Sequence, residues 1–337
     1  MKAVVLVGGE GTRLRPLTET IPKPLIPLID RPFLDHVLDH LDAHGVDEVL
    51  LSSPYLGERF TDFLRARTSS PGVTWITEDA PLGTGGAIAH ATRSLDDTFF
   101  VLNGDILTDL DLGALLAFHR EREARATITV SEVQDARPYG LVSMDGAGRI
   151  SEFREKPIDS TPGIVNAGTY VLEPSALAGV PPDRLVSIER EVFPSLIDAG
   201  AQVFGFRSTA YWIDLGTPEK YLRATFDALD GRVGGIDVPA PYVHPSARVS
   251  LRARLGRWVV IQQGVEVADE TEIEDSVVLA GASIGPGVRL RDSIVGPEAV
   301  IGGGAKVSGA VLAEGSAVAE GAEAEGARIS AGHTLGA

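Results

Sequence analysis

The sequence predicts a three-layer α/β domain with a mostly parallel sheet, followed by a left-handed parallel β-helix. Two observations carry this prediction. Over the first two thirds of the 337 residues, short apolar runs alternate with amphipathic stretches, as strands and helices alternate in α/β domains. From Val243 onward, aliphatic residues recur instead at every sixth position, with small and turn residues between them.

The change of pattern sets the expected domains. We expect an α/β domain over 1–232, a linker over 233–242 that is rich in glycine and proline, and the β-helix over 243–337. The six-residue repeat shifts register at Glu274-Asp275-Ser276 and fades in the Ala/Gly/Glu-rich run 313–326, where we expect less ordered coils. A β-helix offers surfaces for assembly, so a homo-oligomer is expected.

The first predicted strand, Lys2 to Val7, ends in the glycine-rich turn Gly8-Gly9-Glu10-Gly11-Thr12-Arg13. Glycine adopts positive φ angles without steric cost, and without Cβ atoms the backbone N–H groups can converge on phosphate oxygens. Arg13 adds positive charge, and Lys23 follows between two prolines that stiffen its backbone. The stretch therefore predicts a triphosphate-binding loop.

Two better-known glycine loops are excluded by counting. The dinucleotide fingerprint needs a third glycine where this chain has Leu14, and the P-loop ends in a Gly-Lys-Ser/Thr run that the sequence lacks. The motif that remains, Gly-Gly-x-Gly-Thr-Arg-Leu-x-Pro-Leu-Thr followed by Pro-Lys-Pro-Leu, resembles the sugar-1-phosphate nucleotidyltransferase family. The resemblance covers approximately Met1 to Leu229 and implies a Rossmann-like mixed sheet of the GT-A-like type. It implies a nucleotide site at Leu6, Gly8, Gly9, Gly11, Thr12 and Arg13.

A second glycine-rich stretch, Thr77 to Ala87, resembles the segment that reads the nucleobase in this family. We expect Glu78, Gly83 and Thr84 to bind the nucleotide here. An ionised glutamate only accepts hydrogen bonds, and guanine presents two adjacent donors, so Glu78 favours GTP over the other triphosphates. The alternative is that Glu78 faces solvent. The run Pro-Leu-Gly-Thr-Gly-Gly-Ala-Ile also resembles the guanylyltransferases for mannose 1-phosphate and manno-heptose 1-phosphate.

Two aspartates match the metal carboxylates of the family. Asp105 follows a buried predicted strand in Asn103-Gly104-Asp105, at the strand end where open α/β sheets bind ligands. Asp214 follows a short apolar run before a helix that proline initiates. The resemblance implies that both hold Mg²⁺, which would bridge phosphate oxygens. A role as helix cap, the alternative for Asp105, suits Asp109 or Asp111 better.

The sugar phosphate is expected to bind further along the chain. Glu-Lys-Pro at 155–157 matches the family motif in which the lysine grips the phosphate, which assigns Lys156 this role beside Glu155. By the same resemblance, Asn103, Tyr139, Gly140 and Asn166 contact the sugar. An amide suits hydroxyl groups because it both donates and accepts hydrogen bonds.

Composition narrows the setting. The net charge of −17 disfavours sequence-independent binding to nucleic acids or anionic membranes, which need a basic surface. The sequence contains no cysteine, no apolar run long enough to span a bilayer and no signal-peptide pattern, so a cytoplasmic protein is expected. His36, His40 and His44 share one face of the helix predicted from Phe33, and a solvated face or subunit contact is expected there.

The predicted activity is sugar-1-phosphate guanylyl transfer, with Arg13, Lys23 and Lys156 as the catalytic cations and Mg²⁺ as the cofactor. Thymidylyl, uridylyl or adenylyl transfer is the first alternative. A non-catalytic regulatory subunit that binds sugar nucleotide is the second, although such a protein would not need the metal carboxylates. Acyl transfer by the β-helix is disfavoured because that region contains only His244 and His333.

Overall fold

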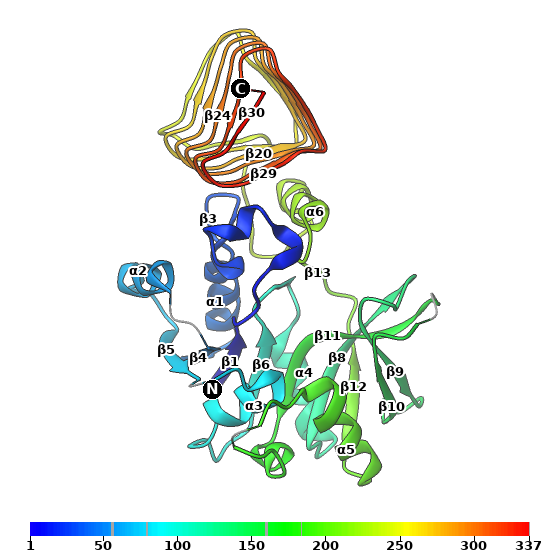
Figure 1. The fold of residues 1–337 in the computed structure, drawn as a ribbon. Helices are drawn as coiled ribbons and strands as arrows, with labels where there is room; N and C mark the ends of the chain where they lie inside the picture. Colours follow the sequence, from blue (N-terminus) through cyan, green and yellow to red (C-terminus); the bar gives the residue numbers. More distant parts are fainter. Residues whose placement is uncertain (55–56, 79, 159–160, 183, 337) are drawn as a thin grey trace. The chain divides into compact units, whose positions relative to one another are not determined.

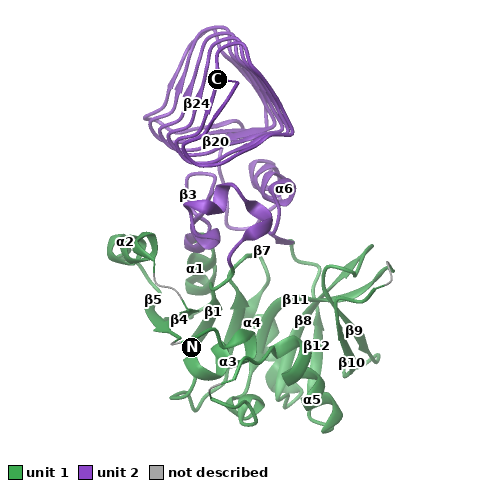
Figure 2. Ribbon diagram, viewed as in Figure 1, with its two compact units in different colours: residues 1–9, 36–212 green, residues 10–35, 213–337 purple. Residues whose placement is uncertain are grey.

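The computed structural model describes residues 1–337 except 55–56, 79, 159–160, 183 and 337. The contacts divide the chain into two compact units, each built from two stretches of sequence. Residues 1–9 and 36–212 form the first, which we call the sheet unit (Figure 2). Residues 10–35 and 213–337 form the second, which we call the β-helix unit.

A mixed sheet of nine strands forms the sheet unit (Figure 1). The main path runs β10-β9-β11-β6-β1-β4-β5, with β8 paired to β11 and β12 paired to β8. The strands β1, β4, β5 and β6 are parallel, whereas β11 is antiparallel to β6. The bounds are β1 Lys2–Leu6, β4 Glu48–Ser53, β5 Gly72–Thr77, β6 Phe99–Asn103, β8 Ala126–Val133, β9 Gly140–Met144, β10 Ile150–Glu155, β11 Gly163–Leu172 and β12 Val203–Arg207. The predicted Rossmann-like mixed sheet is confirmed.

The central strands are buried because their side chains are apolar on both faces. Val4, Val101 and Tyr170 are fully buried in neighbouring strands of this sheet. The unit's helical segments and its short strand β7 complete it: α1 Phe33–Ala43, α2 Glu58–Ala66, α3 Gly83–Ala91, α4 Leu112–Glu121, α5 Phe193–Asp198, the 3₁₀ turn η4 Pro174–Leu177, the π-helix η5 Ile188–Val192 and β7 Ile106–Thr108. The helix expected from Phe33 is therefore present.

The histidines at the end of α1 and just beyond it are less exposed than a solvated face would be. His40 and His44 lie with their ring centroids 4.6 Å apart, and neither side chain is fully exposed. Burial is the first cause that lowers the pKa of His40 to about 4, and the neighbouring His44 is the second. The expectation of a solvated stripe is therefore wrong for His40, because the backbone near Leu110 lies against its ring.

Three parallel sheets wind into the β-helix, whose coils have a triangular outline in Figure 1. Paired residues are 18 positions apart in the first coil, as in Tyr242 and Val260, and 17 apart afterwards, as in Val260 and Val277. One sheet contains β14 Tyr242–Val243, β17 Val259–Ile261, β20 Ser276–Val278, β23 Ile294–Val295, β26 Val311–Leu312 and β29 Arg328–Ile329. The second contains β15 Arg248–Val249, β18 Glu266–Val267, β21 Ser283–Ile284, β24 Val300–Ile301, β27 Ala317–Val318 and β30 Thr334–Leu335. The third contains β16 Arg254–Leu255, β19 Glu272–Glu274, β22 Arg289–Arg291, β25 Lys306–Ser308 and β28 Glu323–Glu325.

The register shift noted in the sequence is a structural feature of every later coil. The corner at Asp275 has a φ of 46°, and the equivalent corners Asp292, Gly309 and Gly326 also have positive φ. A tight left-handed corner saves one residue per coil, which turns three six-residue repeats into a 17-residue period. The parallel β-helix is confirmed, and its left-handed sense stays a prediction.

The expectation that the coils fade after Ala313 is wrong. Strands β27 and β28 continue the stack in register with the coil before them. Alanine fills the interior there, with Ala324 at the place that Leu290 and Val307 occupy in earlier coils. A small inward side chain weakens the six-residue signal in the sequence without interrupting the coil.

The units cut the chain differently from the expected boundaries at 232 and 243. The segment 10–35 and the helix α6 (Pro218–Leu229) share a unit with the β-helix. The segment contains the 3₁₀ turns η1 Thr12–Leu14, η2 Leu17–Glu19 and η3 Lys23–Leu25 and the hairpin strands β2 Pro27–Leu28 and β3 Arg31–Pro32. Strand β13 Trp212–Asp214 leads into α6.

In the described part of the chain, none of the helices has both the length and the apolar character that a membrane span requires.

Candidate active site

The glycine-rich turn leaves β1 and divides between the units. Leu6, Gly8 and Gly9 belong to the sheet unit, whereas Gly11, Thr12 and Arg13 begin the β-helix unit. Gly11 has a φ of 62°, and a Cβ there would lie 2.9 Å from Thr18 Cγ2 and 3.2 Å from Lys23 Cβ. Only glycine therefore fits at Gly11, because the turn folds back onto the stem of Lys23.

Arg13 and Asp214 come together inside the β-helix unit. A Cβ on Gly216 would lie 2.6 Å from Asp214 Oδ1 and 2.9 Å from Arg13 Nη2, so both groups crowd onto this glycine. Asp214 is 8% exposed, and the Nζ atom of Lys220 in the first turn of α6 pairs with its Oδ2 atom. Asp214 therefore lies close to two cationic side chains, those of Arg13 and Lys220.

Lys220 is a functional candidate that the sequence reasoning missed. Thr217 caps α6 by accepting a hydrogen bond from the Lys220 backbone N–H at 3.3 Å, which places Lys220 in the first helical turn. The available signal was a lysine six residues after a predicted metal ligand, at the start of a helix that proline initiates.

Glu78 is buried at the end of β5, with 5% of its surface exposed. One carboxylate oxygen accepts a hydrogen bond from Ser52 Oγ at 3.1 Å and the other from the Leu82 N–H at 2.9 Å. The alternative of a solvent-facing Glu78 is therefore wrong. Each oxygen keeps a second lone pair, and the contact with guanine stays a prediction.

The glycine turn at the start of α3 rests on a segment that sequence reasoning left unassigned. Thr84 Oγ1 donates to Glu189 Oε2 at 2.7 Å and accepts from the Ile188 N–H at 2.9 Å. Ser187 Oγ also donates to Glu189 Oε2, at 2.8 Å. Glu189 lies in the π-helix η5, and such irregular turns are frequent at functional sites.

Asn103 ends β6, and Asp105 follows it after Gly104. The Gly104 N–H donates to the Leu6 carbonyl at 2.9 Å, which ties this turn to the end of β1. Asp105 lies in the turn between β6 and β7, and its assignment as a metal ligand stays a prediction. Asp111 accepts a hydrogen bond from the Ala114 N–H at 2.9 Å and caps α4. The helix-cap role in this stretch therefore belongs to Asp111, as expected.

Lys156 has a backbone conformation that is rare for its residue type. Its φ is 52°, and its N–H donates to the Tyr139 carbonyl at 2.9 Å. Its Nζ atom lies 3.9 Å from Glu155 Oε1, and Gly140 faces Glu155 across β9 and β10. Left-handed residues other than glycine persist where the surroundings impose them, typically at functional sites. The structure thus brings Tyr139, Gly140, Glu155 and Lys156 together.

Asn166 lies on β11 with both ends of its amide engaged. Its Nδ2 atom donates to Tyr170 Oη at 2.8 Å, and its Oδ1 atom accepts from the Gly168 N–H at 2.9 Å. The Tyr139 ring lies 5.2 Å from the Trp212 ring, and Trp212 Nε1 donates to the Ala167 carbonyl at 2.8 Å. Trp212 therefore belongs beside the predicted sugar-binding residues, although the sequence reasoning did not assign it.

Burial and Glu189 act on two residues of the predicted sugar site in the sheet unit. Burial raises the pKa of Glu155, and repulsion from Glu189 adds to the effect. Burial also raises the pKa of Tyr170 well above its usual value, and Glu189 is again the second cause. The π-helix residue Glu189 therefore lies near both Glu155 and the tyrosine that holds Asn166.

Comparison with known proteins identifies the family. Residues 2–231 match the family described as Nucleotidyl transferase, and residues 238–335 match the GMPPB C-terminal domain. The chain is 38% identical over 294 residues to the mannose-1-phosphate guanylyltransferase of Mycobacterium tuberculosis, covering 84% of this chain and 80% of that protein. It is 31% identical over 306 residues to a UTP–glucose-1-phosphate uridylyltransferase of Synechocystis sp., covering 85% and 79%.

A solved structure is also similar to this chain. HddC from Yersinia pseudotuberculosis, crystallised with GMP-PN, superimposes with a TM-score of 0.59 at 32% sequence identity. The superposition covers 66% of this chain and 97% of HddC. This protein is therefore a nucleotidyltransferase and a member of the Nucleotidyl transferase family.

Proposed function

We propose that the protein is a sugar-1-phosphate guanylyltransferase, which converts GTP and mannose 1-phosphate or manno-heptose 1-phosphate to a GDP-sugar and pyrophosphate. The observation that carries the proposal is the closeness of predicted phosphate-binding cations to predicted carboxylates. Arg13 lies beside Asp214 at Gly216, and Lys156 lies beside Glu155. The relatives named as guanylyltransferases support the same activity.

The proposed reaction is a direct in-line displacement. A phosphate oxygen of the sugar 1-phosphate forms a bond to the α-phosphorus of GTP while the bond to the pyrophosphate oxygen breaks. Lys156 holds the attacking phosphate, and Arg13 and Lys23 neutralise the charge that develops on the departing pyrophosphate. No covalent intermediate with the protein is needed.

Asp105 and Asp214 are proposed to hold Mg²⁺, since members of the family generally use a divalent metal ion. Among the described residues, no group of three or more His, Cys, Asp or Glu side chains forms a metal site. Two carboxylates suffice for Mg²⁺, which takes its other ligands from substrate phosphates and water. When bound, the ion neutralises phosphate charge and orients the reactants.

The preference for guanine is assigned to the loop from Glu78 to Thr84. Burial of Glu78 favours this role over a surface one, and its hydrogen bonds fix the loop from which base contacts would come. Uridylyl, thymidylyl or adenylyl transfer is the alternative, and the uridylyltransferase among the relatives keeps it open. The homo-oligomer and the cytoplasmic location stay predictions.

The test is pyrophosphate release with Mg²⁺, using each of GTP, ATP, UTP and dTTP with mannose, glucose and manno-heptose 1-phosphates. Preference for GTP supports the base assignment, activity with another nucleotide overturns that assignment alone, and no release from any pair favours the regulatory alternative. Lys156→Ala is expected to lower turnover by about 10²- to 10³-fold. Arg154→Ala, two residues earlier on β10 and paired with Glu152, is the matched control and should retain near-full activity.

A further inference from the structure

The segment 10–35, which contains Arg13 and Lys23, is hydrogen-bonded to both the early coils and the last coil of the β-helix. Glu19 accepts hydrogen bonds from Ser330 Oγ at 3.0 Å and from the Ala331 N–H at 3.1 Å, both in the last coil. In the early coils, Gln262 Nε2 donates to the Ile29 carbonyl at 2.7 Å and Tyr242 Oη donates to Asp30 Oδ2 at 2.9 Å. These contacts form a clasp that lies entirely within the β-helix unit.

Gln262 is built into the clasp. It is 4% exposed, and its Oε1 atom accepts from the Ala280 N–H at 3.1 Å while its Nε2 atom reaches Ile29. At the same corner of the next three coils the chain has Leu279, Gly296 and Ala313, which give no side-chain hydrogen bond. The polar residue returns at that corner only at Ser330, the other end of the clasp.

The backbone that Gln262 holds is strained. Ile29 has a φ of 62°, although its side chain is branched at Cβ and fully buried. A β-branched residue is rare in the left-handed region and persists there only when its surroundings impose it. Two hydrogen bonds stabilise this conformation here, one accepted by the carbonyl of Ile29 and one by the carboxylate of Asp30. Tyr221 Oη on α6 adds a third bond, to the Pro27 carbonyl at 2.7 Å.

Within the segment 10–35, the hairpin of β2 and β3 lies directly beside Lys23. The Phe33 N–H donates to the Ile26 carbonyl at 3.0 Å, and the Ile26 N–H donates to the Lys23 carbonyl at 3.2 Å. Lys23 in turn packs its Cβ atom against Gly11. A shift of the turn at Ile29 is therefore passed to Lys23 and to the glycine turn through a short, hydrogen-bonded path.

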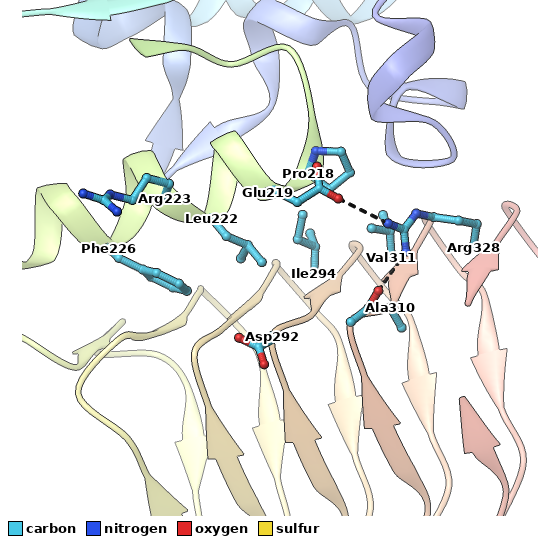
Figure 3. Close-up of a pocket in the computed structure, with 11 residues that line it drawn as sticks. Pro218, Glu219, Leu222, Arg223, Phe226, Asp292, Ile294, Ala310, Val311 and Arg328 are labelled. Carbon is cyan, nitrogen blue, oxygen red and sulfur yellow. Dashed lines mark hydrogen bonds and ion pairs between the residues drawn. The ribbon is translucent and has the colours of Figure 1, made fainter. Parts of the chain in front are cut away.

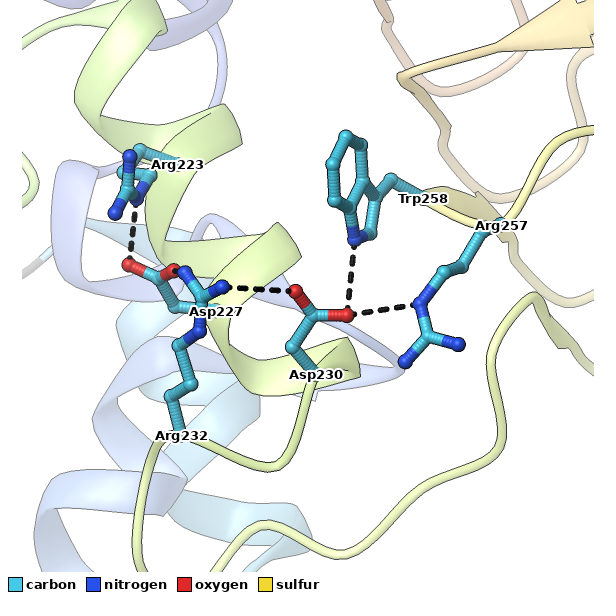
Figure 4. A network of polar contacts seen from close by, with 6 residues as sticks. All are labelled: Arg223, Asp227, Asp230, Arg232, Arg257 and Trp258. Atoms are coloured by element: carbon cyan, nitrogen blue, oxygen red, sulfur yellow. Dashed lines mark hydrogen bonds and ion pairs between the residues drawn. The ribbon is translucent and has the colours of Figure 1, made fainter.

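The helix that follows Asp214 is fastened to the β-helix in the same way. Near its start, Glu219 Oε1 lies 3.7 Å from Nη2 of Arg328, in strand β29 (Figure 3). Just beyond its end, Asp230 accepts from Arg257 Nε at 2.9 Å and from Trp258 Nε1 at 3.0 Å (Figure 4). Between these ties α6 and the coils border a cavity of about 340 Å³.

We infer that Gln262 is a positioning residue for Lys23, and that the β-helix holds the pyrophosphate-binding segment of the enzyme in its working conformation. The inference rests on the proposed function, because it assigns Lys23 to pyrophosphate. It predicts that damage to the clasp weakens pyrophosphate and triphosphate binding while the sugar phosphate, held by Lys156 in the sheet unit, binds as before.

Gln262→Glu tests the inference most sharply. The variant keeps an acceptor for the Ala280 N–H but replaces the donor to Ile29 with an anionic oxygen. In the reverse reaction the KM for pyrophosphate should rise about tenfold, while the KM for sugar 1-phosphate in the forward reaction changes by less than about twofold. Amide hydrogen exchange over residues 22–33 should become faster, since the hairpin loses its tie.

Thr271→Val is the matched control. Thr271 is fully buried in the β-helix, and its Oγ1 atom donates to the Gly285 carbonyl at 2.9 Å without touching the clasp. It should lower thermal stability to a similar extent and leave both KM values and the exchange over 22–33 unchanged. Tyr242→Phe, which removes one exposed contact, should raise the KM for pyrophosphate roughly threefold and keeps the test available if Gln262→Glu does not fold.

Equal kinetic effects of Gln262→Glu and Thr271→Val would overturn the inference, as would exchange over 22–33 that neither clasp variant alters. A parent protein without activity on any substrate pair would instead sink the proposed function. Even then the exchange measurement would report on the clasp independently.

Discussion

The sheet unit buries ionisable side chains, whereas the coils of the β-helix bury only neutral polar ones among the described residues. In the sheet unit Glu78 and His119 are almost fully buried, and burial shifts the pKa values of Glu155 and His40. In the described coils from 243 to 336, the buried polar side chains are all neutral, namely Gln262, Thr271, Ser276, Ser293 and Ser316. Buried ionisable groups cost folding free energy, so their location indicates where the chain carries out chemistry and where it provides support.

The comparison also explains why Gln262 stands out. Ser276 and Ser293 each bond to the neighbouring coil, with Ser293 N–H donating to Ser276 Oγ at 3.1 Å. Thr271 likewise bonds within the stack. Gln262 alone among these five uses a side-chain bond on a segment outside the coils, in the part of the chain that the structure describes. A departure from the repeat is therefore the most informative position in a repeating structure.

The largest expected effect concerns the packing of the coils. Ile284→Ala in β21 should lower the free energy of unfolding of the β-helix by about 2–5 kcal/mol, because its side chain is 1% exposed and the coil above and below cannot close the cavity. Urea unfolding followed by the fluorescence of Trp258 measures this. Val300→Ala, at a 48% exposed position of the same sheet, is the control and should be near neutral. Equal losses would contradict the inward–outward assignment.

The second effect separates the buried ionisable groups of the sheet unit from the exposed ones of the coils. Since burial lowers the pKa of His40 from 6.5 to about 4, the unfolded chain takes up a proton first as pH falls. The contribution of the uncharged His40 to the free energy of unfolding is fully present above pH 6.5 and declines between pH 6.5 and 4. Below pH 4 the free energy of unfolding is lower by about 3 kcal/mol.

Urea unfolding between pH 7.5 and 5 checks this, because His40→Gln should remove that part of the pH dependence. His333→Gln, which removes an exposed imidazole from the last coil, is the control. If the two variants have the same pH dependence, burial of His40 does not control acid stability.

The smallest effect concerns the charged ladder on the outer face of the coils. Arg254 Nη2 lies 2.6 Å from Glu272 Oε1, but 80% of the Arg254 side chain is exposed. Arg254→Ala should therefore cost about 0.5 kcal/mol, and the cost should fall further in 0.5 M salt. A loss above about 2 kcal/mol in thermal or urea unfolding would mean that the ladder is structural.

Much of the fold was predictable because both regions have a strong period. The alternation of strands and helices and the six-residue repeat are set by local side-chain patterns, which the sequence displays directly. The motifs assigned Gly11 and Lys23 to one predicted phosphate-binding stretch, and in the structure Gly11 lies against Lys23. The roles of these residues stay predictions. The ion pair of Asp214 with Lys220 and its closeness to Arg13 were not predictable, since they depend on how distant segments pack.

The remaining differences have the same origin. The partnership of the segment 10–35 with the coils depends on single hydrogen bonds across more than 200 positions of sequence, as between Ile29 and Gln262. The burial of His40 and the role of Glu189 likewise arise from neighbours that are remote along the chain. The outer coils were underestimated because alanine gives little periodic signal, although it fills the narrow interior.

The 17-residue period has a consequence for how this chain can change in length. Gln262 and Ser330 occupy the same corner four coils apart, and coils stacked like neighbouring strands are spaced by about 4.8 Å, so the coils measure off roughly 19 Å between the two fastening points. Gain or loss of one coil would leave the stack itself intact and move one fastening point away from its partner. The number of coils between Gln262 and Ser330 is thus fixed by the dimensions of the phosphate-binding segment, whereas coils added beyond Ser330 would be free to vary.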